Sequence, residues 1–105
     1  MNPYRLLGVH RQSSDEEIYA AYKAAARSSH PDAGGRAEDF IPVAAAWAVL
    51  GDRNKRSQWL RAALARYKLC HGCKGAGALY RQRGLTQRVW QGCATCHGAG
   101  VIIHE

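Results

Sequence analysis

Four cysteines in two closely spaced pairs are the residues of this 105-residue chain best suited to chemistry. Cys70 and Cys73 form the first pair and Cys93 and Cys96 the second, with 19 residues between the pairs. Two thiolates at positions i and i+3 can face one ion, and two such turns complete a tetrahedral site. The spacing is typical of a structural zinc site. The pattern therefore predicts a metal site of four thiolates, in a compartment that keeps thiols reduced.

A Cys-x-x-Cys pair also occurs in thiol–disulfide redox centres, which are the alternative chemistry for these residues. Such centres usually lie within a strand–helix–strand unit, and no alternation of that kind surrounds either pair. His71 and His97 are further candidate ligands beside the cysteines. Because four thiolates already complete a tetrahedral site, we expect both imidazoles to stay outside it.

A second candidate site is the tripeptide His30-Pro31-Asp32, which is followed by Gly34 and Gly35. Proline fixes the backbone of a turn, while the imidazole and the carboxylate offer a donor and an acceptor to a partner. In isolation the tripeptide predicts only a turn, because proline and aspartate are ordinary turn residues. Whether it is a binding site depends on the elements on either side of it.

Four helices are predicted before the cysteines, and the two longest flank the tripeptide. Asn2 before Pro3 is an N-cap, and Gly8 ends the first, short helix. Ser14 with Glu17 forms a capping box at the start of the second helix. The next three helices show apolar residues at helical spacing: Ile18, Ala21, Tyr22, Ala25 and Ala26; then Phe40, Val43, Ala44, Trp47 and Leu50; then Leu60, Ala63, Leu64 and Tyr67. We expect the second and third helices to pack as an antiparallel hairpin across residues 30–38.

This helical part resembles the J-domain of the DnaJ family of cochaperones. The resemblance rests on residues 2–9, the capped helix with Ile18 and Tyr22, His30-Pro31-Asp32, and residues 40–52 followed by Lys55-Arg56. It implies that the loop and the second helix dock on a seventy-kilodalton heat-shock chaperone of the DnaK type and stimulate its ATP hydrolysis. The residues expected to bind that partner are Lys23, Arg27, His30, Pro31 and Asp32.

Each cysteine pair is followed by the same pattern, Lys74-Gly-Ala-Gly77 after the first and His97-Gly-Ala-Gly100 after the second. This CxxCxGxG repeat is similar to the zinc-binding region of DnaJ proteins, which usually has four copies that make two sites. Two copies imply one zinc ion per chain. Between them, residues 79–81 and 85–90 predict strands joined around Arg83 and Gly84. So small a unit has little core of its own, and we expect the metal to hold it together.

Basic residues are concentrated in the second part of the chain. Residues 61–105 carry seven basic residues and one acidic residue, a balance of +6 within a net charge of +7. The candidates for binding a polyanion are Lys74, Arg81, Arg83 and Arg88. They interleave with Tyr80 and Trp90, a composition that suits phosphate contacts and base stacking. A solvated hairpin whose aromatic residues cover the metal site accounts for the same composition equally well.

The sequence as a whole predicts a mainly α protein, with a four-helix J-domain at residues 1–68 and a single-zinc β-hairpin module at residues 69–105. No Ser/His/Asp arrangement, phosphate-binding loop or carboxylate pair indicates an enzyme. No apolar run approaches the roughly 18 residues of a membrane helix, so we expect a cytoplasmic protein without a membrane partner. The predicted function is a cochaperone of a DnaK-type chaperone whose zinc hairpin targets a specific protein. The alternative is a small nucleic-acid-binding zinc protein that uses the J-fold as a scaffold.

Overall fold

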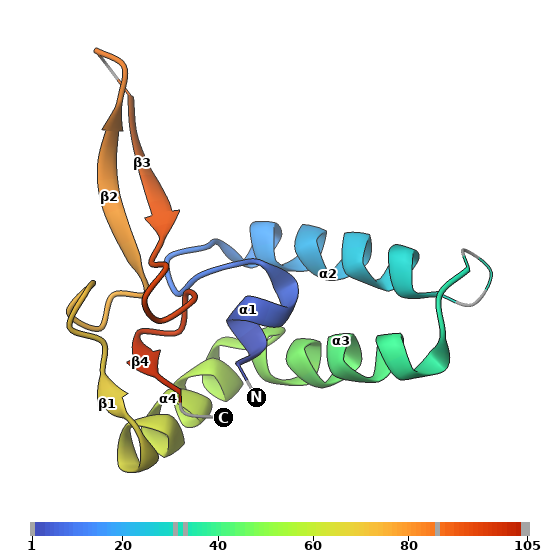
Figure 1. Ribbon diagram of the computed structural model, residues 1–105. Coiled ribbons are helices and arrows are strands. Elements are labelled where there is room, and N and C mark those ends of the chain that lie inside the picture. The colour runs from blue at the N-terminus through green and yellow to red at the C-terminus, as the bar shows by residue number, and fades with distance from the viewer. Residues whose placement is uncertain (1, 31, 33, 86, 104–105) are drawn as a thin grey trace.

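The computed structural model describes residues 2–30, 32, 34–85 and 87–103, without the side chains of Arg83 and Arg88. The helices are α1 (Pro3–Leu7), α2 (Asp15–Ser29), α3 (Ala37–Leu50) and α4 (Arg53–Arg66). The strands are β1 (Lys68–Leu69), β2 (Ala78–Arg83), β3 (Gln87–Gly92) and β4 (Val101–Ile102). In Figure 1, α2 and α3 extend to one side of the molecule and the β2–β3 hairpin projects from the other. The predicted fold class, a helical J-domain followed by a small β module, is confirmed.

The helix ends coincide with the predicted capping residues. Asn2 Oδ1 accepts hydrogen bonds from the backbone N–H groups of Tyr4 and Arg5, at 3.1 and 3.3 Å. Gly8, with φ 70°, ends α1, and the capping box at Ser14 starts α2. Such side chains satisfy N–H groups that the first turn of a helix leaves without partners. Local sequence therefore sets where these two helices begin.

The helical core is formed mainly by one face of each helix. α2 and α3 run antiparallel (Figure 1), and Tyr22 of α2 stacks on Trp47 of α3 with ring centroids 4.6 Å apart. The buried core residues are Tyr4, Leu7, Ile18, Val43, Ala46, Leu50, Ala63, Ala99 and Val101. Ala99 and Val101 lie beyond the predicted boundary at residue 68, so the hydrophobic core crosses it. The division of the chain into two domains there stays a prediction.

Two small antiparallel sheets form the second module. β1 pairs with β4, with Leu69 opposite Val101, and β2 pairs with β3, with Tyr80 opposite Trp90. The expectation that residues 85–90 form one strand was wrong at its start, because the ladder ends at the pair Arg83–Gln87. Leu85 lies in the turn instead and is 95% exposed.

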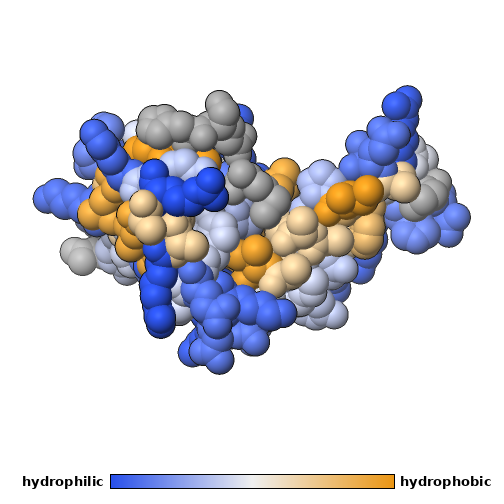
Figure 2. All heavy atoms as spheres, turned by 90° about the horizontal axis from the view of Figure 1, so that it is seen from below, coloured by the Kyte–Doolittle hydropathy of each residue, from blue (hydrophilic) through white to orange (hydrophobic). Residues whose placement is uncertain are grey.

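The surface mixes apolar and polar side chains. On the face that Figure 2 shows, hydrophobic side chains gather in separate patches between hydrophilic ones. The large apolar residues that are exposed include Ile41 of α3 and Leu64 of α4. Single residues of this kind are ordinary on folded proteins and carry no functional weight by themselves. Within the described residues, every helix is too short or too polar to cross a membrane.

Candidate functional site

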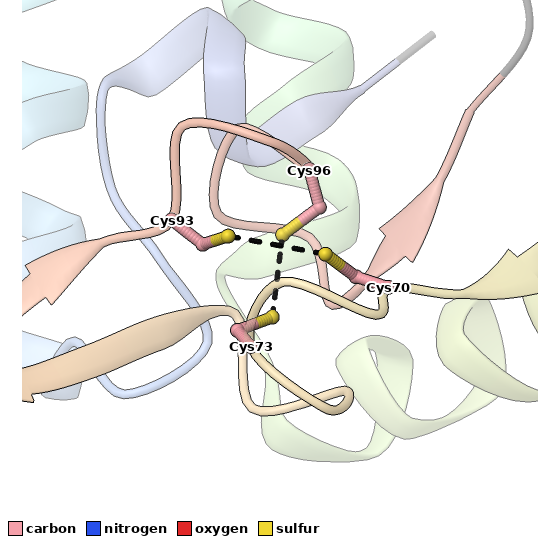
Figure 3. Close-up of side chains that lie close together, drawn as sticks. All are labelled: Cys70, Cys73, Cys93 and Cys96. Carbon is pink, nitrogen blue, oxygen red and sulfur yellow. Dashed lines mark hydrogen bonds between the residues drawn. The ribbon is translucent and has the colours of Figure 1, made fainter.

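Two loops bring the four cysteine side chains together at the base of the second module (Figure 3). The sulfur atoms of Cys70 and Cys93 are 3.8 Å apart, and those of Cys73 and Cys96 are 3.6 Å apart. All four sulfurs lie within 4.8 Å of one another, and all four residues are buried. A zinc–sulfur bond of about 2.3 Å gives a tetrahedron with edges of about 3.8 Å. The four cysteines therefore have the spacing of a tetrahedral metal site and could hold one ion.

The two cysteine loops stabilise thiolates in the same way. The Gly77 N–H donates to Cys73 Sγ and the Gly100 N–H donates to Cys96 Sγ, each at 3.2 Å. Both glycines have positive φ, 79° and 81°, a conformation that glycine adopts without strain. Hydrogen bonds to the charged form of a group favour that form. The repeated glycines thus let the backbone turn its N–H groups toward the sulfurs.

The acidities of the cysteines are unequal. Burial acts to raise the pKa of Cys93, but the backbone N–H groups of Cys96 and Thr95 outweigh it and lower that pKa to about 7. Burial raises the pKa of Cys96 to about 12, although the Gly100 N–H acts in the opposite direction. Burial likewise raises the pKa of Cys70. Four thiolates this close repel one another, and a divalent cation removes that cost by taking the place of the protons.

The predicted partner-binding loop lies between α2 and α3, at the end of the helical hairpin far from the strands (Figure 1). The side chains of His30 and Asp32 are 56% and 95% exposed. His30 Nδ1 accepts a hydrogen bond from the Asp32 N–H at 3.2 Å. In the neutral imidazole the proton is then on Nε2, where it can be donated to a partner. Pro31 lies outside the described residues.

The two predicted basic residues of α2 lead toward this loop. Lys23 and Arg27 are exposed and four residues apart, so they lie on one face of the helix. Arg27 also lines, with Ala26, His30 and Asp32, a shallow hollow of about 390 Å³. The structure thus brings Lys23, Arg27, His30 and Asp32 onto one side of α2 and its C-terminal end.

Tyr19 belongs to the same face of α2 and was not predicted. The Lys23 Nζ lies 4.5 Å from the centre of the Tyr19 ring, and this ring lies 5.5 Å from the ring of Trp47 on α3. A cation over an aromatic face is attracted by the ring electrons. Tyr19 therefore holds Lys23 in place. The sequence feature that could have predicted this contact is the position of Tyr19 four residues before Lys23.

The four residues predicted to bind a polyanion are spread over the second module. Lys74 is exposed in the first cysteine loop, where its φ is 56°, whereas Arg81 is exposed on β2. The side chains of Arg83 and Arg88 lie outside the described part of the structure. The two candidates whose side chains are described thus lie on different elements of the module.

The two aromatic residues of the hairpin pack against each other. The rings of Tyr80 and Trp90 have centroids 4.8 Å apart at an angle of 47°, and the two residues remain 54% and 44% exposed. The partly buried residues that pack against the cysteines are Leu79 and Ile102. The exposed rings therefore form a surface of their own on the hairpin.

Fold and site together define a class of protein, a four-helix domain with an exposed His-x-Asp loop that is continued by a four-cysteine module. The DnaJ domain family matches residues 2–59, which is more than half of the chain. The chain belongs to this family of J-domain cochaperones.

Curated relatives match over the same helical region. "Chaperone protein dnaJ 3" of Arabidopsis thaliana is 47% identical over 53 residues, which is 50% of this chain and 13% of that protein. "Tetratricopeptide repeat and J domain-containing co-chaperone DNJ1" of Mycosarcoma maydis is 43% identical over 56 residues, or 53% of this chain and 10% of that protein. Human "DnaJ homolog subfamily C member 16" is 41% identical over 61 residues, or 55% of this chain and 8% of that protein. The chain thus spans only a small part of the length of these relatives.

Proposed function

We propose that this chain docks on a DnaK-type chaperone and stimulates its ATP hydrolysis, with Lys23, Arg27, His30, Pro31 and Asp32 as the contact residues. The observation that carries the proposal is the exposed His30–Asp32 pair at the end of a helix whose outer face presents two cations. In this proposal the residues that hydrolyse ATP belong to the partner. It acts by binding the partner in the state that hydrolyses ATP.

The contact residues have different roles in docking. Lys23 and Arg27 attract an acidic surface and speed the encounter, because charge complementarity acts mainly on association. His30 then offers the Nε2 proton as a donor, and Asp32 offers its carboxylate as an acceptor. The Asp32 backbone N–H donates to His30 Nδ1, and this bond orients the imidazole before the partner arrives.

Zinc, one ion per chain, is the cofactor that we propose for the four cysteines. The donor set is purely thiolate, which favours zinc over hard cations such as magnesium or calcium. All four ligand positions come from the protein, and a closed site of this kind has a structural role. When bound, zinc neutralises the thiolates and ties the two cysteine loops together.

A protein is the target that we propose for the β2–β3 hairpin. The support is the exposed Tyr80–Trp90 pair, because aromatic residues are enriched at protein interfaces. Arg81 on the same hairpin supports nucleic-acid binding as the second candidate function. The two candidates differ in the salt dependence of binding, because the affinity for nucleic acid falls steeply as the salt concentration rises.

Single-turnover ATP hydrolysis by a DnaK-type chaperone tests the docking proposal. The chain should accelerate hydrolysis, and His30→Gln should abolish the acceleration while the helical circular dichroism stays unchanged. Ser28→Ala is the matched control, because Ser28 is exposed on the same turn and its hydroxyl donates, among the described residues, to carbonyls of its own helix. Equal hydrolysis rates with and without the chain would refute the proposal.

A further inference from the structure

The segment that follows α1, residues 9–12, docks on both cysteine loops. The Arg11 N–H donates to the carbonyl oxygen of Gly98 at 3.0 Å, and the Arg11 guanidinium donates to that of Gly75. Gln12 Nε2 donates to the carbonyl oxygen of Ala76 at 3.0 Å. Carbonyls of the first and the second loop are therefore held by one short stretch of the J-domain.

The repeated glycines of the cysteine loops make room for this docking segment. A Cβ on Gly77 would lie 2.8 Å from Arg11 Cβ, and a Cβ on Gly100 would lie 2.9 Å from Arg11 Cδ. A Cβ on Gly98 would lie 2.4 Å from the carbonyl oxygen of Val9. The side chain of Arg11 thus lies against the equivalent glycines of both repeats. These glycines serve the docking of the J-domain as well as the turns around the ion.

Asn2 makes a second connection between the helices and the metal site. Its Oδ1 caps α1, and its Nδ2 donates to the carbonyl oxygen of Cys96 at 3.1 Å. The residue is only 7% exposed. One buried side chain therefore joins the start of the first helix to the backbone of a predicted metal ligand.

The hydrophobic core provides a third connection. Ala99 and Val101, which follow the last cysteine, are fully buried in the same cluster as Tyr4 of α1 and Leu50 of α3. Val101 also pairs with Leu69 at the start of the module. Burial of apolar area is the main favourable term in folding, so the helices gain stability from residues of the second module.

We propose that metal binding by the four cysteines stabilises the J-domain through Asn2, Arg11 and the shared core, so that metal occupancy controls the cochaperone. The regulatory part rests on the proposed function above, whereas the stability coupling does not. Without the ion the cysteine loops lose the geometry that aims their carbonyls at Asn2 and Arg11. Val101 is then no longer held in the core by the strand pair. A helical domain of this size has little stability to spare.

Thermal unfolding of the full chain, under reducing conditions, tests the coupling. Helical circular dichroism at 222 nm is followed for the zinc-loaded protein and for the same protein after chelation. Removal of the metal should lower the midpoint of the helical transition by about 10 °C or more, since several buried contacts are lost together. Amide hydrogen exchange should rise in α1 and at the C-terminal end of α3. An unchanged midpoint with unchanged exchange would overturn the proposal.

Two variants and one control show whether the named residues carry the coupling. Asn2→Asp keeps an oxygen that caps α1 but loses the donor to Cys96, and Arg11→Ala removes the guanidinium that bonds to Gly75. Both variants should still bind one zinc by elemental analysis, while the midpoint shift on chelation falls to about half or less. Arg61→Ala, an exposed arginine of α4, should keep the full shift. The assignment to Asn2 and Arg11 is overturned if the variants and the control shift alike.

The same samples separate this inference from the proposed function. If chelation lowers the helical midpoint but even the loaded chain fails to stimulate a DnaK-type chaperone, the coupling stands and the proposed function fails. If the loaded and the chelated chain stimulate equally at a temperature between their two measured midpoints, metal control fails and the proposed function stands.

Discussion

A substitution at Gly100 tests how closely the second cysteine loop packs on the docking segment, residues 9–12. Gly100 has φ 81°, and an added Cβ would lie 2.6 Å from the carbonyl oxygen of Gly75 and 2.9 Å from Arg11 Cδ. Gly84 in the hairpin turn has a similar φ of 72°, but a Cβ there meets no atom of the described residues within 4 Å. The left-handed conformation costs an L residue roughly 1–2 kcal/mol at either position. Overpacking adds about 1–3 kcal/mol at Gly100 only.

The expected losses of unfolding free energy are therefore about 2–5 kcal/mol for Gly100→Ala and about 1–2 kcal/mol for Gly84→Ala. Urea unfolding of the metal-loaded chain measures both, with helical circular dichroism as the signal and equal m-values as the check that the transitions are comparable. Because the backbone strain is shared, the difference between the variants isolates the contact with Gly75 and Arg11. Equal losses in the two variants would refute the packing argument.

Three further predictions concern charge. A hydrogen bond from Arg56 lowers the pKa of Asp15, so the stabilisation by Asp15 is present above its ordinary pKa of 3.8 and is lost as the pH falls through the lowered pKa. Asp15→Asn should therefore lower the urea midpoint at neutral pH and match the unmodified chain in acid, and equal midpoints at neutral pH would contradict this. Lys23→Ala should slow association with a DnaK-type chaperone in stopped-flow measurements, more at low salt than at high salt, and a rate unchanged at low salt would exclude steering by Lys23. Fluorescence anisotropy should show weak binding of single-stranded DNA or RNA at physiological salt. Sub-micromolar binding that is lost when Arg81, Arg83 and Arg88 are replaced would make nucleic acid the primary partner.

Much of the fold can be predicted because its signals are local. Asn2 and Ser14 cap helices with their own side chains, and Gly8 ends α1 by adopting a left-handed conformation. The cysteine spacing predicts a metal site for a similar reason, because each pair forms within one turn of the backbone. Such features need no knowledge of the distant parts of the chain.

The remaining features depend on contacts between residues far apart in the sequence. Arg11 is a single arginine in a loop, and nothing near it in the sequence indicates that it lies against Gly77 and Gly100. Ala46 and Ala99 are fully buried, but alanine is common on helices and in loops whether buried or exposed. The shared core and the docking segment were therefore visible only once the tertiary structure was known.

The surface of this chain that contacts the partner tests the central claim most directly. Backbone amide NMR of the isotope-labelled, zinc-loaded chain, titrated with an unlabelled DnaK-type chaperone in its ATP-bound state, reports which residues meet the partner. The account predicts that signals of Lys23, Arg27, His30 and Asp32 shift or broaden first, and that those of the exposed α4 residue Arg61 do not. Changes confined to the β2–β3 hairpin, or no change at concentrations well above those of the ATPase assay, would contradict it.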